Sequence, residues 1–86
     1  MPPRRRRPPR SPDHEALGEA VRRLRTRAGL SQEQLAERMA TDLTQVGGIE
    51  RGIRNPSYTT LVRLAAALDT RVGAIVNLAD RLRERG

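Results

Sequence analysis

The side chains best suited to hydrogen-bond a nucleic acid lie close together in the middle of the chain. Gln45 carries a forked amide that can make two hydrogen bonds to the edge of an adenine. Arg51 and Arg54 carry guanidinium groups that stay charged and can make two parallel hydrogen bonds to a phosphate. Such side chains act together only if the elements around them place them on one surface.

The residues that catalysis or metal binding would need do not form a set in this sequence. The chain has no cysteine, and His14 is its only histidine, so neither a thiolate site nor a zinc site is expected. Gly47-Gly48 does not make a phosphate-binding loop, because the rest of such a motif is missing. We therefore expect a protein that is not an enzyme and that needs no metal or cofactor.

Residues 31–52 have the pattern of two short helices joined by a tight turn. Ser31 and Gln34 can form a capping box at the start of the first helix. Asp42 is a suitable N-cap for the second helix, and Gly52 can end it. This is the helix-turn-helix layout, in which the second helix can enter the major groove of DNA.

The whole chain predicts one compact all-α domain, residues 13–86, that follows a disordered tail. The tail, residues 1–12, contains five prolines and five arginines and cannot bury apolar surface. Since Phe and Trp are absent, aliphatic residues and alanine must fill the core. We expect N-caps at Asp13, Ser57 and Thr70. The five predicted helices cover about 13–28, 32–39, 43–51, 58–68 and 70–83.

The net charge of +7 is unevenly distributed along the chain. The arginines before Ser11 contribute +5, and residues 11–86 carry only +2. No apolar run is long enough to cross a membrane, and no secretory leader follows the basic start, so we expect a cytoplasmic protein. The basic residues of the tail are Arg4, Arg5, Arg6, Arg7 and Arg10.

Three short motifs follow one another at fixed distances along the chain. They are Ala28-Gly29-Leu30-Ser31-Gln32, Ile49-Glu50-Arg51-Gly52 and Arg54-Asn55-Pro56-Ser57. Their order and spacing resemble the lambda-repressor-like (Cro/repressor, Xre-type) helix-turn-helix family over roughly residues 15–76. The resemblance implies a DNA-binding domain of compact helices whose third helix reads the major groove.

The resemblance places base contacts on the third helix. Thr44 can meet a base edge or a thymine methyl, and Gln45 an adenine. Leu43 can pack on a thymine methyl or share a buried face with Val46. Gly47 and Gly48 depart from the family, in which polar or basic side chains are common here; either the helix backbone approaches DNA closely there or the position reads no base. The implied base-contact positions are Leu43, Thr44, Gln45 and Gly48.

The resemblance also implies contacts to the DNA backbone and one internal ion pair. Gln32 would bond a phosphate, unless it is simply an exposed residue of the first turn. The loop residues Arg51, Arg54 and Asn55 would bind phosphates and sometimes bases, unless they are solvated surface groups. The family pairs Arg25 with Glu50 in a partly buried ion pair, to which we assign a structural role.

The basic tail has three interpretations. It can be an arm that wraps DNA, as minor-groove arms do. It can bind RNA or an anionic surface without sequence preference. It can also be an unused leader from a misassigned start codon.

The sequence therefore predicts a transcriptional regulator, most simply a repressor, that binds double-stranded DNA as a homodimer. With no room for a sensor domain, it would be regulated by abundance or by a separate sensor partner. One alternative is an antitoxin that binds DNA and a toxin; another is a protein-interaction module that keeps the fold without base readout.

The fifth helix is the candidate dimer contact, because its apolar residues span more than one stripe. Apolar surface left over in a monomer would be buried across a two-fold axis. The alternative is that all of these residues join the core of one chain. They are Val72, Ile75, Val76, Leu78, Ala79 and Leu82.

Overall fold

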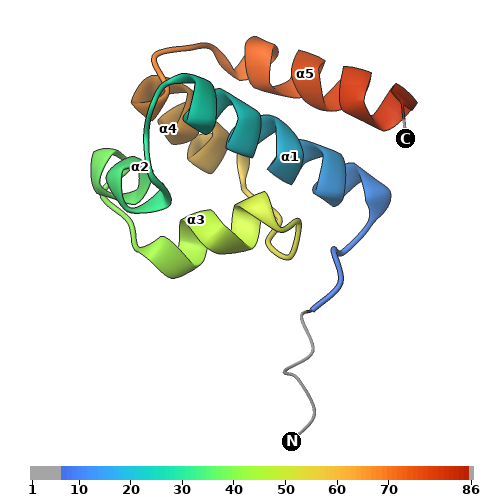
Figure 1. The fold of residues 1–86 in the computed structure, drawn as a ribbon, viewed down its shortest axis with the longest axis horizontal. Coiled ribbons are helices and arrows are strands. Elements are labelled where there is room, and N and C mark those ends of the chain that lie inside the picture. The colour runs from blue at the N-terminus through green and yellow to red at the C-terminus, as the bar shows by residue number, and fades with distance from the viewer. Residues whose placement is uncertain (1–6, 86) are drawn as a thin grey trace, which may run out of the picture.

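The computed structural model describes residues 7–85, and this part of the chain consists of helices joined by short turns (Figure 1). The predicted all-α fold is confirmed, and the predicted bounds differ from the observed ones by at most two residues. The helices are α1 (Pro12–Arg27), α2 (Gln32–Arg38), α3 (Leu43–Glu50), α4 (Tyr58–Ala67) and α5 (Val72–Arg85).

The core lies where all of these helices meet, and each of them contributes to it. Val21, Leu35, Ile49, Leu64 and Ile75 come from five different helices, and each is at most 1 % exposed. These aliphatic side chains replace the aromatic residues that larger cores use. In Figure 1, α1 runs between α5 on one side and α3 on the other, so it is the helix that supports α3 from behind.

Three predicted helix starts are present as local hydrogen bonds. The Ser31 hydroxyl accepts a hydrogen bond from the Gln34 N–H at 3.0 Å, and the Gln34 side chain accepts one from the Ser31 N–H at 2.8 Å. Asp42 accepts a bond from the Gln45 N–H at 2.8 Å. The Ser57 hydroxyl accepts one from the Thr60 N–H at 3.2 Å. Each bond satisfies an N–H that has no partner within the helix.

The start of α1 differs from the prediction. Asp13 is not the N-cap: Ser11 is, and its side chain accepts a hydrogen bond from the His14 N–H at 3.2 Å. Pro12 then occupies the first turn, where a missing N–H costs no hydrogen bond. Ser11 is therefore the N-cap of α1, and Pro12 is its first residue.

The start of α5 also differs, because Thr70 is used by the preceding turn. Its N–H donates to the Ala65 carbonyl at 2.8 Å and so helps to end α4. Asp69 in the same turn has a φ of 54°, the left-handed conformation common where a helix ends. α5 begins after this turn, at Val72, and Thr70 is not its N-cap.

The prediction that α5 has spare apolar surface is wrong for most of the residues concerned. Ile75, Leu78 and Ala79 are buried, and Val72 and Leu82 pack against the core clusters as partly buried side chains. The reason is that α5 lies along α1 in the same chain, where Ala20 leaves room for Leu78 and Ala79. Val76 remains exposed, at 37 %.

α1 and α3 approach each other closely at Gly18. A Cβ atom built on Gly18 would lie 2.5 Å from the Ile49 carbonyl oxygen and would also collide with the Glu50 carbonyl. Any side chain larger than hydrogen would therefore push the two helix backbones apart. Gly18 could not be recognised from the sequence, because a glycine inside a helix gives no local sign of what it touches.

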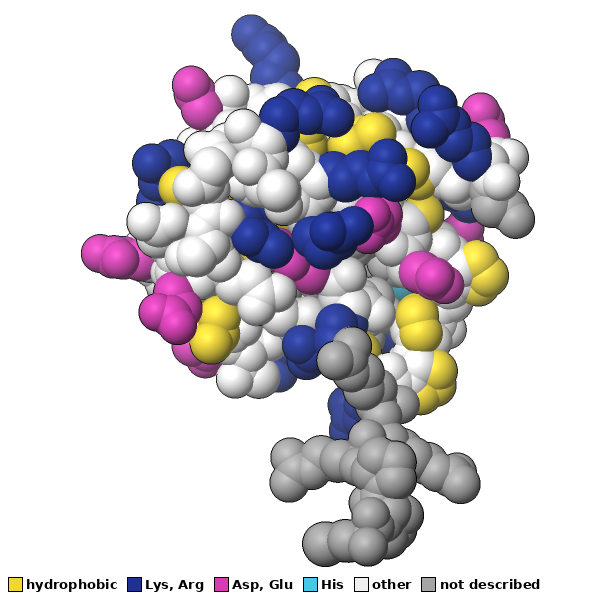
Figure 2. All heavy atoms as spheres, in the orientation of Figure 1, with side chains coloured by type: hydrophobic (Ala, Val, Ile, Leu, Met, Phe, Trp, Pro, Cys, Tyr) yellow, Lys and Arg dark blue, Asp and Glu magenta, His cyan; other side chains and the backbone are white. Residues whose placement is uncertain are grey.

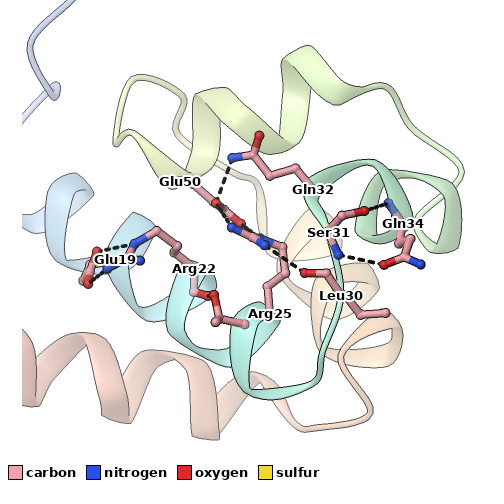
Figure 3. Close-up of polar contacts among 9 residues, drawn as sticks. Glu19, Arg22, Arg25, Leu30, Ser31, Gln32, Gln34 and Glu50 are labelled. Atoms are coloured by element: carbon pink, nitrogen blue, oxygen red, sulfur yellow. Dashed lines mark hydrogen bonds and ion pairs between the residues drawn. The ribbon is translucent and has the colours of Figure 1, made fainter.

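An ion pair between Arg25 of α1 and Glu50 of α3 joins the same two helices. The Arg25 guanidinium donates to Glu50 through Nε at 2.6 Å and through Nη2 at 3.1 Å (Figure 3). The side chains of Arg25 and Glu50 are 15 % and 2 % exposed. Arg25 also donates to the Leu30 carbonyl at 2.8 Å, so it ties the α1–α2 turn to the end of α3.

We expect Gly18→Ala to destabilise the fold by about 1–3 kcal/mol, since the added methyl group meets backbone atoms that cannot turn away. Urea denaturation measures the loss. Gly73→Ala is the matched control: nothing lies within 4 Å of its Cβ position, so it should be neutral or gain up to about 1 kcal/mol of helix stability. A Gly18→Ala variant as stable as the control would mean that α1 and α3 have room to separate.

We expect Arg25→Met and Glu50→Met each to cost about 3–5 kcal/mol of unfolding free energy, because each leaves a buried charge without its partner. The double variant should recover part of that loss in a denaturation double-mutant cycle. Losses that simply add would mean that the two side chains act independently.

Candidate nucleic-acid interface

Most of the predicted contact residues line one shallow concave surface. They come from the segment before α1, the start of α2, the first two turns of α3 and the loop that follows α3. Ile53 joins them, although the sequence analysis did not identify it. The lining residues are Arg7, Arg10, Gln32, Thr44, Gln45, Gly48, Arg51, Ile53, Arg54 and Asn55. Arg4, Arg5 and Arg6 lie outside the described residues.

α3 presents its first turn outward because its opposite side is anchored in the core. Val46 and Ile49 are at most 1 % exposed, and the Asp42 cap fixes where the helix begins. Thr44 is exposed and Gln45 is half-buried on the outer side. Leu43 is 45 % exposed, so it does not share the buried face of Val46. Leu43 lies beside the concave surface rather than among its lining residues.

Gln32 is held by the ion pair beneath it. Its Nε2 donates to Glu50 Oε1 at 2.9 Å, on the carboxylate that also accepts from Arg25 (Figure 3). The Glu50 carboxylate thus binds side chains from α1 and α2 while it belongs to α3. Gln32 can still donate its second amide hydrogen outward, because a primary amide has two. The network therefore sets the distance between the start of α2 and the outer face of α3.

The loop after α3 folds back onto that helix. Gly52 has a φ of 75°, which turns the chain, and the N–H groups of Ile53 and Arg54 then donate to the Gly48 carbonyl at 2.9 and 3.2 Å. These bonds satisfy a carbonyl that has no partner at the helix end. They also bring Arg51 and Arg54 to the same surface as Thr44 and Gln45.

The segment before α1, residues 7–10, is attached to the same loop. The Arg10 N–H donates to the Gly52 carbonyl at 2.9 Å. Gly52 itself packs on the first turn of α1, where a Cβ atom would lie 2.9 Å from the Glu15 nitrogen. Residues 7–10, which we call the arm, therefore leave the domain beside the C-terminal end of α3, and Arg7 and Arg10 are exposed there.

Positive charge on the concave surface is not neutralised within the described residues 7–85. The ion pairs in this range join Arg22 and Arg23 to Glu19, Arg25 to Glu50, and Arg83 to Asp13 and Asp80. None of them involves Arg7, Arg10, Arg51 or Arg54. The Arg22 guanidinium, hydrogen-bonded to Glu19, holds the pKa of that carboxyl below its ordinary value.

Arginine side chains, dark blue in Figure 2, also appear at the lower edge of the molecule, near the C-terminal end of α3 and the loop that follows it in Figure 1. The surface thus combines hydrogen-bonding side chains with unpaired cations, as a nucleic acid requires. Among the residues that the structure describes, no helix is long and apolar enough to cross a membrane.

Known proteins with similar sequences and structures fit this arrangement. Residues 21–75 match the helix-turn-helix family. The control protein C.SmaI of Serratia marcescens is 42 % identical over 72 residues, which are 84 % of this chain and 86 % of that protein. The immunity repressor of Bacillus phage phi105 is 35 % identical over 79 % of this chain and 47 % of its own length.

A solved structure of a similar protein has the same fold. The restriction-modification controller protein C.AhdI of Aeromonas hydrophila superposes with a TM-score of 0.74 and 43 % identity, over 76 % of this chain and 98 % of that one. The matched family region contains all of α2, α3 and α4, together with the end of α1 and the start of α5. The chain therefore belongs to the helix-turn-helix family of DNA-binding transcriptional regulators.

Proposed function

We propose that this regulator binds a discrete DNA site by placing α3 in the major groove. The observation that carries the proposal is the concave surface itself. The outward first turn of α3, the loop after it and the arm converge there, and its arginines form no ion pair within residues 7–85. Membership of this family also makes the chain a regulator rather than an enzyme.

The proposed contacts to DNA fall into base contacts and phosphate contacts, according to the element that makes them. Thr44 and Gln45 on α3 read base edges, and Leu43 packs on a thymine methyl. Gln32, Arg51 and Asn55 bind phosphates on either side of the groove, which sets the register of α3 without choosing the sequence. The arm contributes Arg7 and Arg10, and the remaining tail arginines extend the same positive charge along the DNA.

The genes that it controls are best inferred from its relatives. C.SmaI and C.AhdI are matched over most of their own length, and both are control proteins. We infer that this chain is a control protein of the same kind, acting on restriction-modification genes. A repressor of phage type is the second candidate, since the phi105 immunity repressor also matches. The antitoxin and the protein-interaction module have no such support, nor does a separate sensor.

The protein would act as a homodimer in the cytoplasm, where its DNA lies. Two copies of α3 spaced one helical turn apart would read a site with dyad symmetry. A contact through α5 has to use the exposed side of that helix, where Val76 lies, because Leu78 is already in the monomer core. α5 lies across α1 from α3, so such a contact would leave the concave surface open (Figure 1).

Selection of bound duplexes from a random pool tests this function. We expect one recurring site with two symmetric halves, the signature of a dimer. Selected duplexes with no shared sequence would overturn base readout, and a site without symmetry would overturn the homodimer.

We expect Gln45→Ala to weaken binding to the selected site by about 1–3 kcal/mol and to relax the preference at one base pair. Gln32→Ala should weaken binding to all duplexes alike, because it contacts phosphate. Fluorescence anisotropy on the site and on a scrambled duplex measures both. A Gln45→Ala loss equal on the two duplexes would show that Gln45 does not read a base. Since Gln32 also bonds Glu50, its variant needs a denaturation control.

We expect the tail to add affinity without choosing sequence. Each neutralised phosphate contributes about −0.9 to the slope of log K against log salt. Replacing the five tail arginines with glutamine should flatten that slope by about 2.7 to 4.5 units, if three to five of them bind phosphate, and should leave the preferred site unchanged.

The matched control replaces Arg81 and Arg85, which are exposed on α5. These two lie on the far side of α1 from α3, so their loss should leave the salt slope as it is. An unchanged slope in the tail variant itself would show that the tail does not contact DNA.

A further inference from the structure

The Gly47-Gly48 pair is the feature of α3 that its fold does not explain. Glycine weakens a helix, because it has more backbone freedom to lose than any other residue. Here two glycines lie side by side in the helix that must be held most accurately. Both are buried although Gly48 lines the concave surface, so other groups of the protein cover them.

Arg54 is the group that covers Gly48. A Cβ atom built on Gly48 would lie 2.8 Å from Cγ, Cδ and Nε of Arg54, so the stem of the arginine crosses the helix where a side chain would stand. The equivalent position on Gly47 meets chiefly the tip of Arg51, with Nη1 at 2.9 Å. The Arg54 contact thus involves the stem of the side chain and not only its end.

The backbone holds Arg54 in this position. Its N–H donates to the Gly48 carbonyl at 3.2 Å, alongside that of Ile53 at 2.9 Å. The backbone of Arg54 is therefore hydrogen-bonded to Gly48, the same residue that its side chain crosses. Arg54 is exposed, and it forms no ion pair among the described residues, so its guanidinium is free to bind a ligand.

Position 48 belongs to the face of α3 that carries the proposed base contacts. Thr44 is four residues before it and Gln45 three residues before it, and these spacings place side chains on one side of a helix. Gly48 has no side chain to contribute there. The Arg54 stem occupies that place, and its guanidinium has the fork that matches O6 and N7 of a guanine.

We propose that Gly48 makes room for Arg54, and that Arg54 reads a guanine in the major groove from the position that residue 48 would otherwise fill. This inference rests on the proposed DNA-binding function. It makes Arg54 a specificity-determining residue and Gly48 its positioning residue. The glycine at position 48 then does not abolish base readout there. It transfers the readout from residue 48 to Arg54.

The alternative role for Arg54 is a phosphate contact, which needs charge but not the fork. Arg54→Lys separates the two roles, because lysine keeps the charge and loses the bidentate geometry. On the selected duplex we expect this variant to keep the wild-type salt slope and to bind about tenfold to a hundredfold more weakly. A variant that binds like the wild type would overturn base reading by Arg54.

The guanine is identified by replacing each guanine of the selected duplex singly with 7-deazaguanine, which lacks the N7 acceptor. We expect one replacement to weaken wild-type binding about tenfold and to leave the binding of Arg54→Ala unchanged. If no guanine behaves in this way, Arg54 does not read a guanine through N7.

Gly48→Ala tests the positioning. The added methyl group should displace Arg54 while circular dichroism and thermal melting show a folded domain. We expect this variant to lose the same guanine preference as Arg54→Ala, and the double variant to lose no more than either. Gly73→Ala, which adds a methyl group into open space on α5, should bind like the wild type. An unaltered preference in folded Gly48→Ala would overturn the positioning role.

Failure of this inference and failure of the proposed function give different results. If wild-type protein selects no discrete site, base readout by α3 fails as a whole. If wild-type protein selects a site and Gln45→Ala changes its preference, while the Arg54 and Gly48 variants do not, only the role of Arg54 is overturned.

Discussion

The Glu50 carboxylate is the point on which the geometry of the interface depends. It is almost completely buried, it belongs to the last turn of α3, and it accepts hydrogen bonds from Arg25 of α1 and Gln32 of α2. A buried carboxylate is unfavourable unless its partners are placed accurately, so the three helices are stable together only in one arrangement. Arg25 extends the constraint to the α1–α2 turn through the Leu30 carbonyl. The orientation of α3 is therefore fixed from behind, by groups that need not touch DNA.

Close backbone approach complements this network. Gly18 lets α1 come against the carbonyls of Ile49 and Glu50, and Gly52 lets the first turn of α1 come against the loop after α3. Gly18 reduces the intrinsic stability of α1 but permits this tertiary contact, whereas Gly52 suits the left-handed backbone at the end of α3. The same exchange operates at Gly48, where the freed space is occupied by Arg54. Gly18 and Gly52 thus allow α3 and the loop after it to pack on α1, and Gly48 allows Arg54 to pack on the outer face of α3.

The sequence predicts the local features of this fold better than its tertiary ones. The capping residues Ser31, Asp42 and Ser57 act within three or four residues of themselves, so their types and spacing are sufficient. The Arg25–Glu50 pair spans 25 residues, and it could be expected only from the family resemblance. The roles of Gly18 and Gly48 depend on which distant atoms approach them, and the burial of Leu78 depends on how α5 lies along α1. No local pattern carries that information.

The proposed base contacts lie on rigid elements, and much of the positive charge lies on the N-terminal segment. This division explains how so small a domain can combine affinity with sequence choice. Base discrimination requires donors held to within a fraction of an ångström, and such precision is available only on α3 and on the loop bonded to Gly48. Affinity has no such requirement, because phosphates repeat along DNA and attract any nearby cation. The near-balanced body of the protein and its strongly basic N-terminal segment follow this division. Charge raises affinity for every sequence alike, so it leaves the ratio between the correct site and other sites unchanged. Charge on a segment joined at Arg10 adds affinity without disturbing the arrangement of α3.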